Sequence, residues 1–158
     1  MSTAGEYRHF AEDVALHFEQ VGLSRTAGRI FGWLLISDPP HQTMDDVVEG
    51  LKVSKSSVSV ATRFLIESGL VQRLSLPGER RDYYCVVEGV WQTFMRQQMN
   101  QVKAFRKLAE QGLKMLADQP AERRNRLREM RDFYAFFEEE IPALLDRWEM
   151  VKSEAEKD

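Results

Sequence analysis

The stretch that decides the fold lies at residues 43–87 and reads TMDDVVEGLKVSKSSVSVATRFLIESGLVQRLSLPGERRDYYCVV. It opens with apolar residues at near-helical spacing, and after a short turn a second helical pattern follows that is rich in serine and lysine. Two runs of β-forming residues come next, one on each side of a Pro-Gly turn. This order of helix, turn, helix and hairpin is the plan of a winged helix-turn-helix, and it predicts DNA binding.

The boundaries within this stretch have local physical causes. Thr43 can cap the first helix, and Asp46 adds negative charge near the positive end of the helix dipole. Ser54 can cap the second helix, and Gly69 should end it because glycine readily adopts the left-handed backbone conformation found there. The second helix is expected to face the core with Val58, Ala61, Leu65 and Ile66.

Composition and charge narrow the classes of function. The chain has 158 residues, 43% apolar content and one cysteine. Because no apolar run approaches the roughly 18 residues of a membrane span, we expect a soluble, cytoplasmic protein. A single cysteine cannot form an internal disulfide. The net charge is −3, yet residues 51–81 contain six basic and two acidic side chains. This local excess predicts a phosphate-facing surface on the winged segment.

The rest of the chain has helical patterns. We expect a helix over residues 5–21, a second from Ser24 to the Asp38-Pro39-Pro40 segment, a long third over 89–117 and a fourth from Pro120. Pro142 should kink the fourth helix or split it in two. The terminal helices contain more aromatic residues than one helix face requires, so we assign them mainly to dimerisation.

The predicted fold is mainly α with a small β-hairpin wing. Its three parts are an N-terminal helix that contributes to dimerisation (1–21), a winged helix-turn-helix DNA-binding domain (22–88) and a C-terminal helical dimerisation region (89–158).

Three stretches resemble the GbsR-type branch of the MarR regulators. They are LSRTAGRIFGWLL at 23–35, VSKSSVS at 53–59 and LPGERRDYY at 76–84. The resemblance implies a prokaryotic, homodimeric winged-helix transcription factor that binds double-stranded DNA at a pseudo-palindromic operator. It further implies that the helix at about 54–68 enters the major groove and that a small-molecule effector binds between the DNA-binding and dimer helices.

Two residues depart from that pattern. Lys52 lies in the turn where such motifs often have glycine, and a left-handed backbone there would cost a non-glycine residue about 1–2 kcal/mol. Asp82 follows the two wing arginines, where it weakens the positive field and can orient an arginine by a salt bridge.

The candidate DNA contacts lie on the outer face of the second motif helix and at the wing tip. Hydroxyl groups suit phosphates or base edges, and an arginine on the helix can make a bidentate base contact. Arginines at a wing tip favour phosphates or a narrow A·T-rich minor groove. The candidates are Lys55, Ser56, Ser57, Ser59, Thr62, Arg63, Arg80 and Arg81.

Five aromatic residues are candidates for an effector pocket, because aromatic boxes bind quaternary ammonium groups by cation–π attraction. They are Trp33, Trp91, Phe94, Tyr134 and Phe137. Core packing is the alternative role for each of them.

Catalysis, metal binding and a cofactor are not expected. His9, His17 and His41 form no recognisable ligand pair, and no nucleophile triad or glycine-rich phosphate loop occurs in a suitable context. The acidic run at 138–140 is interpreted as a solvated helix face.

The arginines within 123–131 either pair with the acidic termini across a dimer or flank DNA. The alternative function is a winged-helix protein-interaction module that does not contact DNA.

Overall fold

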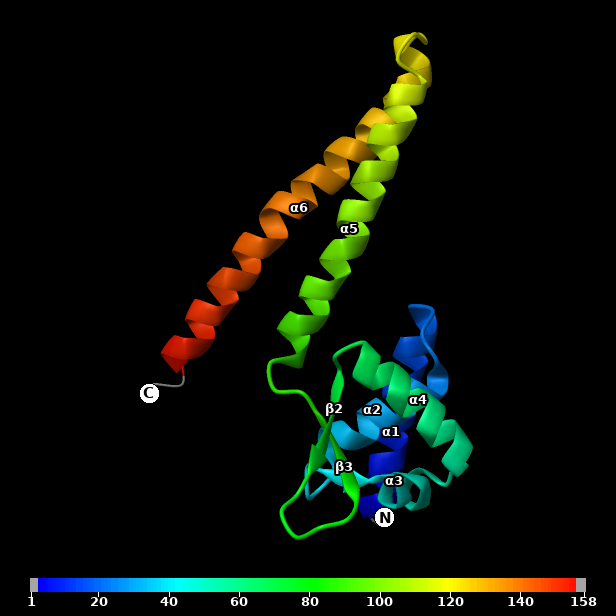
Figure 1. Ribbon diagram of the computed structural model, residues 1–158, viewed down its shortest axis with the longest axis vertical. Helices are drawn as coiled ribbons and strands as arrows, with labels where there is room; N and C mark the ends of the chain where they lie inside the picture. Colours follow the sequence, from blue (N-terminus) through cyan, green and yellow to red (C-terminus); the bar gives the residue numbers. More distant parts are fainter. Residues whose placement is uncertain (1–2, 156–158) are drawn as a thin grey trace. The chain divides into compact units, whose positions relative to one another are not determined.

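The computed structural model describes residues 3–155 and consists of two compact units, which meet in sequence at Val90 and Trp91. The first contains α1 (Thr3–Gln20), α2 (Arg25–Ile36), β1 (Gln42–Thr43), α3 (Met44–Leu51), α4 (Lys55–Glu67), β2 (Val71–Ser75) and β3 (Asp82–Val86). The second is formed by α5 (Val90–Met115) and α6 (Ala121–Ala155) (Figure 1). The prediction of a mainly α fold with a small β wing is confirmed.

Small residues allow α1 and α2 to pack closely in the first unit. Ala11 and Ala15 of α1 are fully buried. A Cβ atom added to Gly28 would lie 2.6 Å from the Ala15 Cα, and one added to Gly32 would lie 2.9 Å from the Ala11 Cα. Helix α1 therefore belongs to the same compact unit as the winged helix.

Helices α3 and α4 form the predicted helix-turn-helix. Thr43 and Asp46 make a capping box at the start of α3, and Ser54 caps α4 by accepting a hydrogen bond from the Ser57 amide. Between them Lys52 has φ 52° and ψ 48°, the left-handed conformation considered above. Gly69, with φ 70°, follows the end of α4 as predicted.

One core assignment on α4 was wrong. Val58, Ala61 and Leu65 are buried as expected, but Ile66 is 37% exposed. Successive residues on a helix are about 100° apart, so a helix that turns Leu65 fully inward carries Ile66 to its flank. Thr62 takes the inward position instead.

The wing is an antiparallel sheet in the order β1-β3-β2. The predicted hairpin is formed by β2 and β3, with Leu74 opposite Tyr83 and Ser75 opposite Asp82. The two-residue strand β1, which the sequence did not predict, pairs with the other edge of β3. It joins the wing to the start of α3, since Thr43 is both its last residue and the α3 cap.

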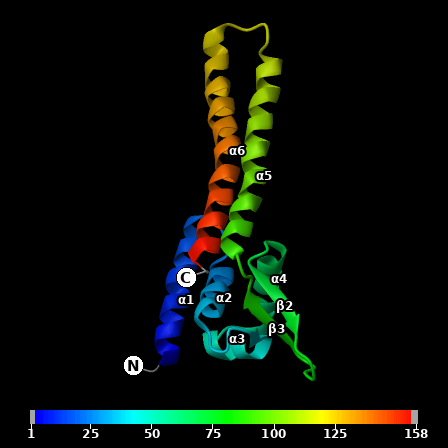
Figure 2. The same ribbon diagram turned by 90° about the vertical axis from the view of Figure 1, so that its left-hand side faces the viewer.

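The second unit is an antiparallel pair of long helices (Figure 2). Near the turn, Gly112 leaves room for Leu127, and the rings of Phe105 and Tyr134 stack at 5.0 Å. The helix axes diverge toward their other ends (Figure 1), where Arg96 bridges to Glu149 at 3.0 Å. Few apolar side chains are therefore buried between the helices.

Helix α6 continues through Pro142, so of the two predicted outcomes, a kink or a split into two helices, the split does not occur. Proline lacks a backbone donor, and the helix tolerates the loss of that one hydrogen bond within its 35 residues. Among the described residues no helix combines the length and the apolar character needed to cross a membrane.

Candidate nucleic-acid interface

The face of α4 opposite the core is exposed and mostly polar. The helix packs inward through Val58, Ala61, Thr62 and Leu65. Its outer face comprises Lys55, Ser56, Val60, Arg63 and Glu67, with Ser59 half-buried on one flank. Six of the eight predicted DNA contacts belong to this helix, and they do not all lie on that face.

Thr62 is the clearest departure from the prediction, because it is only 3% exposed. It follows Val58 by four residues and precedes Leu65 by three, which places it in the buried stripe of the helix. The expectation that Thr62 lies on the outer face was wrong. A side chain this buried does not present its hydroxyl to DNA from the outer face of the helix.

Ser57 is exposed but takes part in the cap of α4. Its hydroxyl lies 2.7 Å from the Ser54 hydroxyl, and its amide donates to the same oxygen at 3.2 Å. Ser56 also lies close to the Ser54 hydroxyl, at 3.1 Å. The start of the helix is therefore fixed by a serine cluster whose members share one oxygen.

Val60 is a surface residue that the sequence analysis missed. Its side chain is 68% exposed, on the same face as Ser56, four residues before it, and Arg63, three residues after it. Aliphatic groups in the major groove contact the thymine methyl group. The helical spacing of Val60 from Arg63 was the available signal, and the sequence analysis gave Val60 no role.

A groove joins the α4 flank to the wing. It has a volume of about 420 Å³ and is lined by Met44, Ser59, Thr62, Arg63, Ile66, Glu67, Arg73 and Tyr84. The groove brings Arg63 of the helix and Arg73 of β2 to one opening. Arg73 was not among the predicted DNA contacts.

The wing contains the other cations. Arg80 and Arg81 are exposed in the turn between β2 and β3. Asp82 forms an ion pair with Arg73, with 3.5 Å between the guanidinium nitrogen and the carboxylate oxygen. The arginine that Asp82 orients is therefore on the neighbouring strand and not at the tip.

Lys55 is held by an acidic residue of α3. Its Nζ donates to the Asp45 Oδ1 at 2.9 Å, and both side chains are largely exposed. The hydrogen bond from Lys55 lowers the pKa of Asp45, and the charges of Lys55 and Arg81 lower it further. The Asp45 carboxylate is thus ionised at neutral pH beside two cations of the candidate interface.

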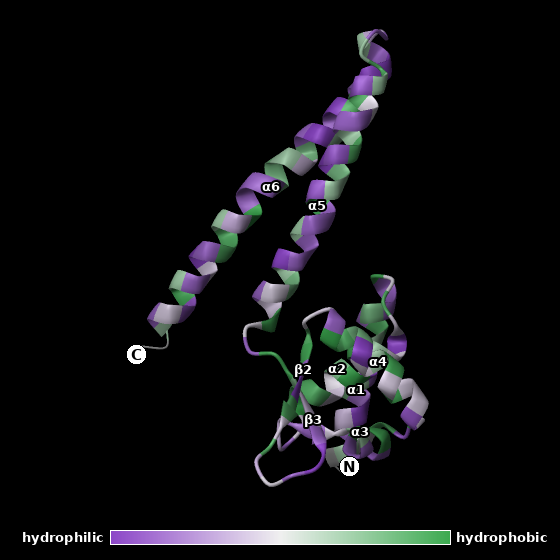
Figure 3. Ribbon diagram, in the orientation of Figure 1, coloured by the Kyte–Doolittle hydropathy of each residue, from purple (hydrophilic) through white to green (hydrophobic). Residues whose placement is uncertain are grey.

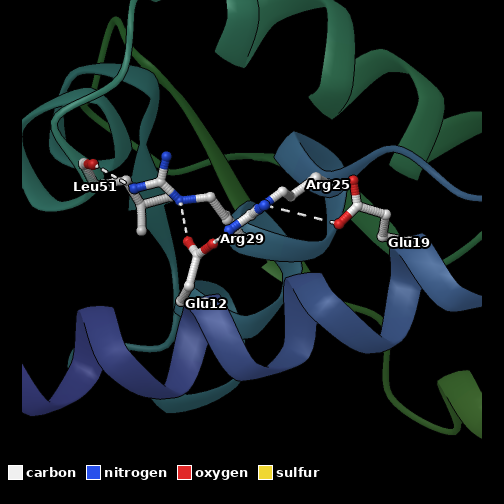
Figure 4. A network of polar contacts seen from close by, with 5 residues as sticks. All are labelled: Glu12, Glu19, Arg25, Arg29 and Leu51. Carbon is white, nitrogen blue, oxygen red and sulfur yellow. Dashed lines mark hydrogen bonds and ion pairs between the residues drawn. The ribbon is translucent and has the colours of Figure 1, made fainter.

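A polar network of α1 and α2 side chains contacts the turn between α3 and α4 (Figure 4). Glu12 of α1 pairs with Arg25 and, at 3.1 Å, with the Arg29 Nε. Arg29 also donates to the Leu51 carbonyl at 3.0 Å, at the end of α3. The hydrogen bond to Glu12 raises the pKa of Arg25. These contacts connect α1 and α2 to the residue just before the left-handed turn.

The five aromatic residues proposed for an effector pocket are not brought together within either unit. Trp33 is buried in the first unit, where its ring lies against Gly50 and edge-on to Tyr7 at 6.2 Å. Tyr134 stacks on Phe105, and Phe137 packs on Phe133 at 4.7 Å.

The remaining two lie near the start of α5. Phe94 precedes Phe105 by eleven residues, about 16 Å along a helix, and Trp91 is further still. These distances separate them from the ring stack around Tyr134, so no single box of five rings is built within one chain.

The structure also describes the possible metal ligands, the acidic run at 138–140 and the arginines within 123–131. Among residues 3–155 no group of three or more His, Cys, Asp or Glu side chains could hold a metal ion. Glu138 of the acidic run pairs with Arg106 at 2.5 Å. In the second basic cluster, Arg131 pairs with Asp132, its neighbour in sequence. Neither expectation for that cluster is tested by these contacts.

Comparisons with family models and with known proteins all find the same family. A MarR family model matches residues 21–82, and a model described as MmpR5-like MarR family transcriptional regulator matches residues 89–151. The HTH-type transcriptional regulator MmpR5 of Mycobacterium tuberculosis is 34% identical over 148 residues, which cover 94% of this chain and 90% of the relative.

Two further likenesses agree. The putative HTH-type transcriptional regulator YvaV of Bacillus subtilis is 28% identical over 87 residues, 55% of this chain and 49% of that protein. A crystal structure described as that of a transcriptional regulator has 34% identity and a TM-score of 0.79, and it covers 92% of this chain and 99% of its own. The GbsR-type branch stays a prediction. The chain belongs to the MarR family of winged helix-turn-helix transcriptional regulators, which are DNA-binding proteins and not enzymes.

Proposed function

We propose that the protein acts as a homodimer on a pseudo-palindromic operator, with α4 in the major groove and the wing along the backbone or in the adjacent minor groove. The observation that carries this proposal is the position of Arg63. It lies on the exposed face of α4 and lines a groove that Arg73 of the wing also lines. One cation of the recognition helix and one cation of the wing thus open onto the same groove.

Base reading is assigned to the outer face of α4. Arg63 is exposed and can make two hydrogen bonds to the edge of a guanine, the most common specific contact in the major groove. Val60 can contact a thymine methyl group, and Ser56 can bond to a base or to a phosphate. Sequence preference is therefore expected to depend most on Arg63.

The wing is assigned to positioning. Arg80 and Arg81 are exposed at its tip, and Asp82 next to them already pairs with Arg73. Charges that meet phosphates or a narrow minor groove increase the affinity for every sequence and fix the register of the protein on the duplex.

The homodimer is proposed from the apolar surface of the second unit. Helix α6 exposes a stripe of large apolar side chains, each more than half accessible: Phe133, Phe136, Leu144, Trp148 and Val151. We call these five residues the α6 stripe. Its ends are 18 residues apart, about 27 Å along the helix.

A second copy is the occupant that also suits the DNA. Two identical stripes can cover each other about a two-fold axis, and a two-fold dimer presents two recognition helices to half-sites about 34 Å apart. Phe10 and Leu16 of α1 are exposed as well, which supports a contribution of the N-terminal helix to the same dimer.

The alternative, a winged-helix module that binds only protein, does not account for the cations collected on α4 and the wing. Control by a small-molecule effector and a cytoplasmic location are typical of the family and remain predictions for this chain. An effector would act by binding better to one spacing of the two motifs, which changes DNA affinity by that differential binding.

The test is recovery of DNA from a genomic pool. Purified protein is incubated with sheared genomic DNA at moderate salt, and the bound fragments are sequenced beside those bound by an Arg63→Ala variant. The proposal predicts a few enriched fragments that share an inverted repeat, with weaker enrichment for the variant. Equal recovery of all fragments by the folded wild-type protein would contradict it.

A further inference from the structure

The ion pair between α3 and α4 lies at the proposed DNA surface. Lys55 is the first residue of α4, and Asp45 is the second residue of α3. Their charged atoms are 2.9 Å apart, with 68% and 65% of the side chains exposed. An exposed pair of this kind is held only weakly against competition from other ions. A DNA phosphate is such a competitor.

Asp45 is not needed for the cap of its own helix. The capping box of α3 is made by Thr43 and Asp46, whose carboxylate accepts from the Thr43 amide at 2.8 Å. Asp45 points instead to the lysine of the next helix, within reach of the charge of Arg81. Its ion pair is therefore with a cation of the candidate interface, Lys55.

We propose that Asp45 is an affinity-limiting residue, which occupies Lys55 as a phosphate would and thereby keeps the binding of all DNA sequences weak. This inference rests on the proposed DNA-binding function. In the free protein Asp45 neutralises Lys55. On DNA, Asp45 competes with a phosphate for Lys55, so the contact between Lys55 and that phosphate is weaker than it would be without the carboxylate.

The consequence is independent of DNA sequence, because phosphates occur at every position. Removing the Asp45 charge frees Lys55 for one further phosphate contact. Each such contact steepens the plot of log affinity against log salt concentration by about 0.9. Across a change from 50 to 200 mM salt, that slope corresponds to a factor of about 3.5.

The experiment is a fluorescence anisotropy titration of a random-sequence duplex between 50 and 200 mM salt. The proteins are the full-length wild type, Asp45→Asn, Lys55→Met and the double variant. Glu49→Gln is the matched control, because it removes the same charge from an exposed position one turn later on α3. Asp45→Ser repeats the test with another side chain, and thermal unfolding establishes that each variant is folded.

We expect Asp45→Asn to bind about three- to tenfold more tightly with a steeper salt slope, and Glu49→Gln to change affinity less than twofold. Lys55→Met should abolish the gain in the Asp45→Asn background, so it should lower the affinity of the Asp45→Asn protein by more than it lowers the affinity of the wild type. Unchanged binding by both Asp45 variants would overturn the inference. An equal loss from Lys55→Met in both backgrounds, or an equal gain from Glu49→Gln, would overturn it as well.

Failure of the proposed function has a different signature. A folded wild-type protein that binds neither this duplex nor the genomic pool would contradict DNA binding itself. A wild type that binds while its Asp45 variants behave identically contradicts only the inference about Asp45.

Discussion

The two units differ in how completely each buries its own apolar residues. The first unit encloses a core of fully buried side chains such as Phe31, Leu51 and Leu65. The second buries Met99, Ala109 and Leu145, while its longer helix exposes the α6 stripe. Hydrophobic and hydrophilic residues alternate along the length of α6 (Figure 3). The first unit is thus complete as a fold and presents a polar, basic face. The second has the surface expected of a protein that folds together with a partner.

The same difference appears in the local signals. Helix ends in the first unit are set by caps and by positive-φ residues, such as Thr43 and Gly69. In the second unit the pairing of the helices rests on the turn at residues 116–120, on packing such as the stack of Phe105 on Tyr134, and on the ion pairs of Arg96 and Arg106. Disruption should therefore affect the two units differently: changes in the first should alter stability or DNA contacts, and changes in the second should alter assembly.

The largest effect is expected from the α6 stripe. Leu144→Glu together with Trp148→Glu places two charges on the apolar stripe and should convert the dimer to monomers. Because linked half-site binding is then lost, affinity for an inverted repeat should fall about 10²–10⁴-fold. Sedimentation velocity and anisotropy measure the two quantities.

Ser153→Glu is the control, since it adds one such charge to another exposed position of α6, outside the α6 stripe. It should leave both mass and affinity unchanged. A double variant that remains dimeric would contradict the role of the stripe.

Next in size is the recognition helix. Arg63→Ala should weaken binding to the recovered operator by about 1–3 kcal/mol and relax the preference at one base pair, because the lost contact reads a base edge. Binding to a set of operators with single base changes measures this. Lys103→Ala, which removes an exposed positive charge from α5, is the control and should leave binding unchanged. An equal loss from Arg63→Ala on all sequences would remove Arg63 from base reading.

A change at the contact between α1 and α2 should have an effect of similar size, but on the free energy of unfolding and not on DNA binding. Gly28→Ala forces a Cβ atom against the Ala15 backbone and should lower the free energy of unfolding by about 1–3 kcal/mol. Gly5→Ala has no atom within 4 Å of the added Cβ and should raise it by up to about 1 kcal/mol through helix propensity. Chemical denaturation measures the change in the free energy of unfolding for each variant. The two changes must have opposite signs if close packing determines the effect at Gly28.

The wing should have a smaller effect on affinity that is uniform across sequences. Arg80→Ala with Arg81→Ala removes two phosphate-facing charges, so the salt slope should become shallower by about 1.8. Affinity should fall about tenfold at low salt for operator and random DNA alike. A salt titration with an unchanged slope would exclude the tip from contact with the backbone.

The smallest effect is expected at the motif turn. Lys52→Gly relieves a left-handed backbone and should stabilise the first unit by about 1 kcal/mol, whereas Lys52→Ala should not. Thermal denaturation compares the two variants. A gain for alanine equal to that for glycine would show that charge at position 52, and not backbone strain, matters.

Sequence reasoning identified the elements whose causes are local. Thr43 with Asp46, Ser54 and Gly69 act within four residues of themselves, so their roles could be predicted from the chain alone. Lys52 was identified as a strained position for the same reason. The resemblance to the MarR regulators, noted in three stretches between residues 23 and 84, is confirmed at the level of the family, and the comparisons extend it over most of the chain. The GbsR-type branch stays a prediction.

What could not be predicted depends on tertiary contacts. The phase of α4 against the core decides that Thr62 is buried and that Ile66 and Val60 are exposed, and periodicity leaves that phase uncertain by one residue. Asp45 reaches Lys55 across ten residues, and β1 exists only because it pairs with β3. The aromatic set was selected by residue type, which does not determine proximity.

The central claim, dimeric recognition through α4, is tested most directly by hydroxyl-radical footprinting on the recovered operator. The account predicts two protected patches related by symmetry, with centres about one helical turn apart on one side of the duplex. A single patch at saturating protein, or protection at all positions alike, would contradict it.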